Sequence, residues 1–413
     1  MLKIQLLKNR LDFEKIFFYL VITFAFILPL SRALVSLIIM LLIVFWLLEG
    51  DFQKKFTTIK NNKLLLSISL FLLWSFVSIF WSDFSKDLLK GMRLNLYFLS
   101  FFVIATSIKR EHINKIITAF LSGMFISEII AYGVFFELWT FKHATPLNPS
   151  PFMMHIDYSV FLAFSSILLL NRIFSKFYSV KEKLILFLFF LTVTGNLFLS
   201  IGRTGQVALI VALIILPIIH YKLSIKSFFI SLLLLATIFF SAYSLSNSFV
   251  MRINNASSDI SKIMHSNLNS SWGIRIAYWI ITFDAFKEHP FGYGLGNHKL
   301  AIQKQIEKNK YLFINQESKE FMSNYHPHNQ YLLIILQTGF IGFLLFLNII
   351  YQLFQYKMQD QELKELSILF ITIYFVSCLA EPLLIKQFPL VLFILFVGLF
   401  AADGMNKSNF NSL

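Results

Sequence analysis

Residues Tyr325–Phe343 read YHPHNQYLLIILQTGFIGF, with two histidines and two amides set directly against an apolar run that carries no charge. Similar apolar runs recur along the chain, whose 413 residues are 57% hydrophobic and only 14% charged. Soluble domains are less apolar and more highly charged than this. The runs do not alternate between apolar and polar residues, as the strands of a membrane β-barrel do. The sequence therefore predicts an all-α integral membrane protein.

The apolar runs predict about twelve membrane-spanning helices. Nine of them fall in residues 1–243, and three fall in residues 331–413, which also include a cytoplasmic tail. The expected spans are Phe17–Leu30, Ala33–Leu48, Leu64–Trp81, Leu94–Ile108, Ile116–Leu138, Phe152–Leu170, Leu184–Ser200, Gln206–Tyr221, Ser227–Tyr243, Tyr331–Phe354, Leu366–Leu384 and Phe388–Ala402.

The net charge of +14 is interpreted as a topology signal. Lysine and arginine concentrate in alternate loops, and the positive-inside rule then places both termini in the cytoplasm. No motif indicates nucleic-acid binding. Residues 244–330 form one long loop on the outer, periplasmic side, between the ninth and tenth spans. Apolar residues at helical spacing predict a helix at Ile274–Phe286, and a more polar helical pattern covers His298–Asn309.

Arginines are frequent on the expected outer side, whereas most lysines fall inside. The planar guanidinium suits phosphate oxygens and stays charged at a membrane interface, so this excess indicates an anionic ligand such as a phosphate or diphosphate. Contact with lipid headgroups is the alternative interpretation. Arg203 is the strongest candidate, because it lies in SIGRTGQ between two apolar spans, where a charge is costly.

Histidines also gather on the outer side, where an imidazole can accept and return a proton near neutral pH. His326 and His328 have the spacing H-x-H, but no H-E-x-x-H motif or cysteine cluster accompanies them, so no metal site is predicted. His326 has an alternative role as a cap of the following helix. We expect His328 to be catalytic. The single cysteine, Cys378, excludes an intrachain disulfide.

Three glycines, Gly292, Gly294 and Gly296, lie in HPFGYGLGNH at residues 289–298. A dinucleotide fingerprint needs a preceding strand and a βαβ unit, and neither is predicted here. The stretch is therefore interpreted as a tight turn that ends the helix before it.

Several of these motifs, in this order, resemble those of a known family. His328 and Asn329, then nine residues, Gly339, two residues and Gly342 resemble the His-Asn-x9-Gly-x2-Gly signature of bacterial O-antigen ligases. Arg275 and Trp279, with three residues between them, followed by HPFGYGLGN, are similar to the periplasmic loop of that family and of related O-antigen polymerases. SIGRTGQ resembles the family's arginine-bearing turn. Ligases often have leucine at the position of Trp279, which leaves ligase and polymerase both open.

The resemblance implies a membrane glycosyltransferase of the GT-C type. It would transfer O-antigen glycan from undecaprenyl diphosphate to a sugar hydroxyl of lipid A–core at the periplasmic face of the bacterial inner membrane. The expected partners are this lipid-linked donor, the lipid A–core acceptor and membrane lipids. No cofactor is expected, because the diphosphate is already an activated leaving group, and direct displacement would invert the anomeric centre.

The same resemblance assigns roles to individual residues. His328 would be the base, Arg203 and Arg275 would stabilise the leaving diphosphate, and Arg93 is a weaker third candidate. The remaining expected roles are substrate contact by His326, orientation of His328 or acceptor binding by Asn329 and Gln330, and close helix approach at Gly339 and Gly342. For Glu381, pairing with an arginine and packing at the helix end are the two alternatives.

Two alternatives to the ligase remain. An O-antigen polymerase or a protein O-oligosaccharyltransferase would use the same donor with a different acceptor. A polysaccharide transporter or flippase would perform no chemistry, but it would be expected to show repeats or to spread intramembrane charge along several spans. Charged and imidazole groups concentrate at one face here, which favours an enzyme.

Overall fold

The computed structural model describes residues 11–245, 247–265 and 267–405, and these are folded almost entirely into helices. The predicted all-α class is confirmed for this part of the chain, whereas the N-terminal lead and the expected cytoplasmic tail after residue 405 lie outside it. The helices are α2 (Phe13–Ile27), α3 (Arg32–Glu49), α4 (Phe52–Asn61), α5 (Lys63–Val77), η1 (Ser78–Trp81), α6 (Lys86–Tyr97), α7 (Leu99–Ser107), α8 (Arg110–Phe135), α9 (His155–Phe174), α10 (Val180–Leu199), α11 (Arg203–Tyr221), α12 (Ile225–Leu245), α13 (Asn247–Met264), α14 (Ser271–Glu288), α15 (His298–Lys308), α16 (Gln316–Asn324), α17 (Gln330–Gln355), α18 (Gln361–Cys378), η2 (Leu383–Ile385) and α19 (Gln387–Met405).

Each expected span coincides with one of these helices or with a consecutive pair of them. Within the described residues, nine helical segments are long and apolar enough to cross a membrane, so the chain is a multi-pass membrane protein. Three expected spans lie outside that group. Helix α2 is short, α12 is only partly described, and α18 carries several charges near its start. The number twelve stays a prediction.

Helices α9 and α19 form the centre of the bundle. Within α9, 83% of the most apolar stretch is buried, and the corresponding figure for α19 is 89%, the highest of the candidate spans. Phenylalanine rings fill the space between these helices and α18: the ring of Phe164 lies 4.5 Å from that of Phe396 and 4.8 Å from that of Phe370. These buried phenylalanines therefore pack helix against helix at the centre of the bundle.

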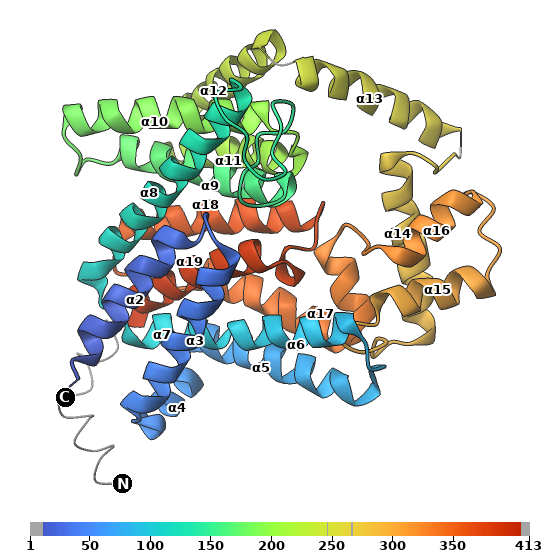
Figure 1. Ribbon diagram of the computed structural model, residues 1–413, viewed down its shortest axis with the longest axis horizontal. Helices are drawn as coiled ribbons and strands as arrows, with labels where there is room; N and C mark the ends of the chain where they lie inside the picture. Colours follow the sequence, from blue (N-terminus) through green and yellow to red (C-terminus); the bar gives the residue numbers. More distant parts are fainter. Residues whose placement is uncertain (1–10, 246, 266, 406–413) are drawn as a thin grey trace.

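Helices α13 to α16, residues 247–324, form a cap at one end of the bundle (Figure 1). The predicted helices at 274–286 and 298–309 are present as α14 and α15, whereas α13 and α16 were not anticipated. The cap has its own small hydrophobic core, which includes Tyr278, Ile302 and Met322 and extends onto α17 through Leu332 and Leu336. Both α14 and α15 pack on α17, so the cap is anchored to the helix that follows it.

A loop of the cap inserts into a break in α17. The helix is interrupted at Gly339, where φ is 63° and ψ is −158°. The carbonyls that the break releases accept hydrogen bonds from the preceding loop, from Tyr293 N to Leu336 O at 2.8 Å and from Gly294 N to Gln337 O at 2.9 Å. In return, Phe340 N donates to Pro290 O at 2.8 Å. These backbone groups at the break thus have partners, which suits a helix interrupted at membrane depth.

The glycines therefore act differently from what the sequence indicated. Gly292 and Gly294 do form a turn after α14, with φ of 80° and 96°, but the turn also docks into α17. A Cβ on Gly339 would lie 2.2 Å from Pro290 O, so a loop approaches this position and the expected neighbouring helix does not. Gly342 does face a helix, because its Cβ would contact Trp74 of α5 at 3.3 Å.

Candidate functional site

The site lies where the cap meets the bundle, at the start of α17. Asn329 is the N-cap of this helix, and its side-chain oxygen accepts from Tyr331 N at 2.9 Å and Leu332 N at 3.1 Å. His328 comes directly before it with a φ of 42°, a left-handed conformation that is uncommon for histidine. The cap that sequence reasoning considered for His326 is thus provided by Asn329, and His328 is held at the helix entrance.

The two amides beside His328 are buried and hydrogen-bonded to backbone. Asn329 Nδ2 donates to Leu379 O at 3.1 Å, and Gln330 Oε1 accepts from Leu384 N at 2.8 Å. Both side chains are 2% exposed, and Gln330 also lines a small cavity. Their contacts join the start of α17 to the connection between α18 and α19. The expected tasks of the two amides, orienting His328 or binding an acceptor sugar, stay predictions.

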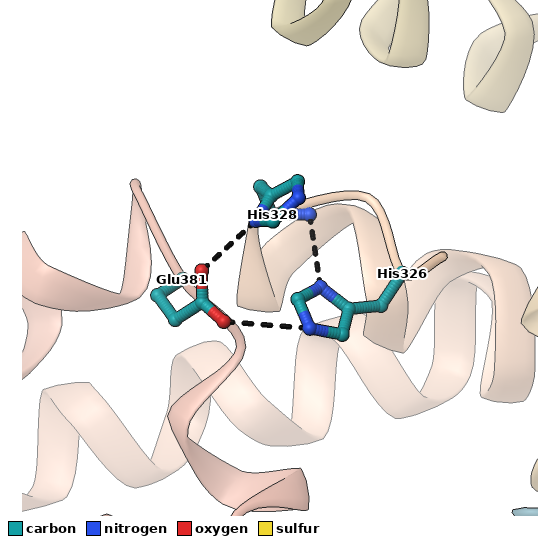
Figure 2. Close-up of side chains that lie close together, drawn as sticks. All are labelled: His326, His328 and Glu381. Carbon is teal, nitrogen blue, oxygen red and sulfur yellow. Dashed lines mark hydrogen bonds and ion pairs between the residues drawn. The ribbon is translucent and has the colours of Figure 1, made fainter. Parts of the chain in front are cut away.

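Both histidines face one carboxylate (Figure 2). His328 Nδ1 lies 3.0 Å from Glu381 Oε2, and His326 Nε2 lies 3.4 Å from Glu381 Oε1. The backbone N–H of His328 donates to His326 Nδ1 at 3.4 Å. An ionised carboxylate only accepts, so Nδ1 of His328 carries a proton, and in the neutral ring Nε2 is the unprotonated nitrogen. Nε2 of His328 has no hydrogen-bond partner within the described residues, and this arrangement is that of an oriented base.

Glu381 is charged in this setting. The carboxyl group is 1% exposed, and burial alone would raise its pKa. The hydrogen bond with His328 and the positive charge of Lys386 outweigh burial and lower the pKa to about 2. Burial lowers the pKa of His326 to about 4, although the Glu381 charge partly offsets this effect. His326 is therefore neutral at physiological pH, and Glu381 stays ionised beside it.

The position of Glu381 corrects the sequence expectation. Helix α18 ends at Cys378, so Glu381 lies in the connection to α19 and outside the helix. Its ion-pair partners are the two histidines and Lys386, and no arginine lies within ion-pairing distance among the described residues. Its expected pairing with an arginine is therefore wrong, and a pairing with histidine takes its place.

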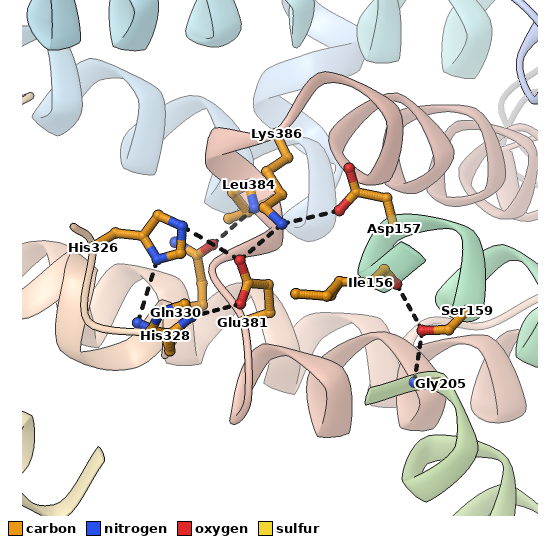
Figure 3. A network of polar contacts seen from close by, with 10 residues as sticks. All are labelled: Ile156, Asp157, Ser159, Gly205, His326, His328, Gln330, Glu381, Leu384 and Lys386. Carbon is orange, nitrogen blue, oxygen red and sulfur yellow. Dashed lines mark hydrogen bonds and ion pairs between the residues drawn. The ribbon is translucent and has the colours of Figure 1, made fainter. Parts of the chain in front are cut away.

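Two residues of this network were not recognised from sequence. Lys386 Nζ lies 2.8 Å from Glu381 Oε1 and 3.1 Å from Asp157 Oδ1, and all three side chains are largely buried (Figure 3). Neither residue was assigned a role from the sequence. An aspartate in the first turn of an apolar helix such as α9 is itself a signal, because a charge there is costly and needs a partner.

Arg203 and Arg275 come to the same region from separate elements. Arg203 is the first residue of α11, whose start is held against α9 by the hydrogen bond from Gly205 N to Ser159 Oγ at 3.0 Å (Figure 3). Arg275 lies on α14 of the cap. Partial burial lowers the pKa of Arg275, the charge of Glu381 raises it, and the charge of Arg203 lowers it. The two guanidinium groups and Glu381 therefore lie near one another.

Neither guanidinium is neutralised. Arg203 and Arg275 are both exposed, and within the described residues neither has an ion pair or a side-chain hydrogen bond. A pair of unpaired arginines beside an oriented imidazole can bind an anion with several oxygens.

Arg93 belongs to a different group of charges. It lies inside α6, which begins at Lys86, well before the expected start of that span at Leu94. Its charge acts on Lys90, and it is not among the charges that act on Arg275. The structure thus brings together Arg203, Arg275, His328 and Glu381, with Arg93 apart from them.

The side chains of His326, His328 and Glu381 lie close enough together to hold a metal ion. One ligand atom each from His326, His328 and Glu381 lies within 4.8 Å of the others. However, Glu381 Oε1 is already 2.8 Å from the Lys386 ammonium, and the other carboxylate oxygen holds His328 Nδ1. An ion would have to displace these contacts beside a buried positive charge, and this donor set therefore fits a proton-transfer role better. Metal independence stays a prediction.

Comparison with known proteins adds an independent observation. Residues 187–347 match a family model described as O-antigen ligase. This range includes both arginines of the pair, the two histidines and the break in α17, but not Glu381 or Lys386. A curated protein of Haemophilus influenzae, whose printed name assigns no function, is 30% identical over 211 residues. That similarity covers 49% of this chain and 51% of the relative, so the chain spans about half the length of the curated relative it matches.

Proposed function

We propose that this chain, part of which matches a family model described as O-antigen ligase, transfers O-antigen glycan from undecaprenyl diphosphate to a sugar hydroxyl of lipid A–core. The observation that carries the proposal is the position of His328. Its Nδ1 is held by Glu381, and its Nε2 has no partner within the described residues. Two unpaired arginines lie in the same region, where the leaving diphosphate needs positive charge.

The reaction follows from these groups. The acceptor hydroxyl oxygen attacks the anomeric carbon of the donor and forms the new glycosidic bond. The bond from that carbon to the diphosphate oxygen breaks, and undecaprenyl diphosphate leaves as an anion. The hydroxyl proton passes to Nε2 of His328, and the resulting imidazolium is stabilised by Glu381. Displacement from the opposite side inverts the anomeric centre, and the activated donor makes a metal or cofactor unnecessary.

The proposed location follows from the charge of the loops. We place the chain in the bacterial inner membrane with both termini in the cytoplasm and with the cap and His328 at the periplasmic face. In this orientation residues 244–330 lie over the site, where both the lipid-linked donor and the lipid A–core acceptor are available.

The base is tested by replacing His328 with alanine. His328→Ala is expected to abolish transfer while the protein is still inserted and expressed at the normal level, because no other described imidazole has a partner-free nitrogen oriented by Glu381. His143→Ala is the matched control, since His143 is an exposed histidine in the loop between α8 and α9. Full-length O-chains on lipid A–core in cells that carry His328→Ala would overturn the role of His328.

The arginine pair is tested by conservative replacement. Arg203→Lys and Arg275→Lys keep the charge but lose the planar fork, and each is expected to reduce transfer. The loss of one well-placed donor commonly costs on the order of 10²–10³ in rate. Normal activity of both variants would contradict the role of the pair in binding the diphosphate.

A polymerase that uses the same donor is the principal alternative, because the family match includes features that both enzymes share. A deletion strain analysed on a lipopolysaccharide gel separates them. Loss of a ligase leaves long lipid-linked chains that never reach lipid A, whereas loss of a polymerase leaves a single repeat unit attached to it.

A further inference from the structure

A row of cations on α6 has no assigned role. Lys86, Lys90 and Arg93 follow at spacings of four and three residues, which places them on one face of the helix. All three are exposed, and within the described residues none forms an ion pair. The acidic residue of this helix is already paired, because Asp87 lies 2.8 Å from Lys299 of the cap. We call Lys86, Lys90 and Arg93 the α6 cation row.

The α6 cation row also lies near the site. Lys90 and Gln330 line the same cavity of about 60 Å³, between α6, the loop at 289–296 and α17. The amide nitrogen of Asn95, which also lines this cavity, is buried and has no hydrogen-bond partner. The charge of Lys90 also contributes to the low pKa of His326. Lys90 therefore lies close to the histidines, with an unused donor beside it.

Two groups of cations on different helices thus lie near the site. The charges of Glu381 and Arg203 act on Arg275, whereas those of Asp87, Lys386, Lys299 and Arg93 act on Lys90. Glu381 acts on Arg275 and Lys90 acts on His326, so each group of cations lies near a side chain of the histidine–glutamate cluster. Two separated groups of unpaired cations are more than one diphosphate requires.

The chemistry of displacement distinguishes the two groups. The nucleophile and the leaving group lie on opposite sides of the anomeric carbon, so the cations that receive the diphosphate cannot be those beside the incoming acceptor. The arginine pair offers forked donors that suit a diphosphate, and the α6 cation row offers mainly lysine ammonium groups, which bind phosphate as point charges. We propose that the α6 cation row binds a phosphate ester on the acceptor glycolipid and so orients its hydroxyl toward His328.

This inference rests on the proposed function, and the test uses the full-length purified chain with lipid-linked donor. The variant is Lys90→Gln combined with Arg93→Gln, and the acceptor is offered intact or after enzymatic removal of its phosphates. The double variant is expected to raise the KM for the intact acceptor roughly tenfold and to leave the KM for the donor unchanged. Dephosphorylation is expected to raise the KM of the unaltered protein by a similar factor and to have no added effect on the variant.

The control removes one charge elsewhere on the cap. Lys310→Gln alters an exposed lysine in the loop after α15 that has no ion pair within the described residues, and it should not change the KM for either acceptor. An equal loss by the double variant on intact and dephosphorylated acceptor would overturn the inference, because the row would then contact anionic bilayer lipid. A rise in the KM for the donor alone would also overturn it.

Binding of the acceptor to His328→Ala, with and without the two α6 changes, distinguishes this inference from the proposed function. If no transfer is detected with any acceptor, the proposed function fails. The binding comparison still decides whether α6 recognises the phosphate: a roughly tenfold weaker binding of the intact acceptor supports recognition, and equal binding contradicts it.

Discussion

Two glutamates of this protein are buried equally deeply and are treated in opposite ways. Glu128 in α8 is 2% exposed and Glu381 after α18 is 1% exposed. Glu381 contacts two histidines and a lysine, whereas both carboxyl oxygens of Glu128 have no hydrogen-bond partner within the described residues. The hydroxyl of nearby Thr192 donates to the backbone of Phe189 at 3.0 Å and is already used.

The contrast shows that burial alone does not make an acid functional. An isolated ionised carboxylate is far more costly to bury than a neutral carboxyl, so Glu128 is best accommodated with its proton on. Glu381 is ionised because its neighbours compensate the charge, and this fixed charge orients His328. Contact with two histidines and a lysine therefore marks Glu381 as part of the site. The absence of such partners around Glu128, within the described residues, argues against the same role for that residue.

The largest effect is expected from removing the lysine that compensates Glu381. Lys386→Met leaves Glu381 and Asp157 without their shared ammonium, and breaking a buried ion pair in this way typically costs about 3–5 kcal/mol. Chemical denaturation of the purified protein in detergent measures the free energy of unfolding. Lys310→Met, at an exposed position, should change it by less than about 0.5 kcal/mol. Equal stability of the two variants would show that the network contributes nothing to the fold.

The next effect is catalytic and comes from Glu381→Gln. The amide keeps the shape of the side chain but removes the charge that holds Nδ1–H of His328 and stabilises the imidazolium. We expect kcat to fall on the order of 10²-fold, with smaller changes in the KM for donor and acceptor. Glu381→Asp, which keeps the charge, should recover part of the loss. An unchanged kcat of Glu381→Gln would indicate that Glu381 has a purely structural role.

Acid sensitivity gives a smaller and graded effect. The pKa of His326 is about 4, below its usual 6.5, so the unfolded chain binds this proton first and stability decreases as pH falls from 6.5 toward 4. The groups that act on His326 are Glu381, His328, Lys386 and Lys90. His326→Gln cannot titrate, and its unfolding free energy should vary less across this range. Identical pH profiles for variant and unaltered protein would contradict this assignment.

The smallest effect is expected at the second glutamate. Glu128→Gln replaces a neutral carboxyl by a neutral amide of the same shape, so activity should be unchanged and stability should shift by less than about 1 kcal/mol. Glu128→Ala is the informative companion, because it also leaves a cavity in the bundle. A loss of transfer by Glu128→Gln as large as that of Glu381→Gln would end the distinction between the two acids.

Local features of the structure could be predicted from the sequence, and long-range pairings could not. Apolar runs located every expected span, and the motif around His328 indicated the start of α17. The break at Gly339 was missed because its partners come from Pro290 to Gly294, some 45 residues earlier by position in the chain. Lys386 and Asp157 lie 229 residues apart, and no local pattern relates them. Family resemblance identified the arginine pair, yet only the fold could show Glu381 against His328.

The left-handed backbone at His328 has a consequence for protein engineering. A side chain at a φ of 42° is strained by about 1–3 kcal/mol, and glycine adopts this conformation without that strain. Random libraries that are screened only for survival on heating would therefore enrich His328→Gly, which lacks the imidazole. A thermostability programme on this protein would collect robust but inactive clones unless each round also demanded glycan transfer.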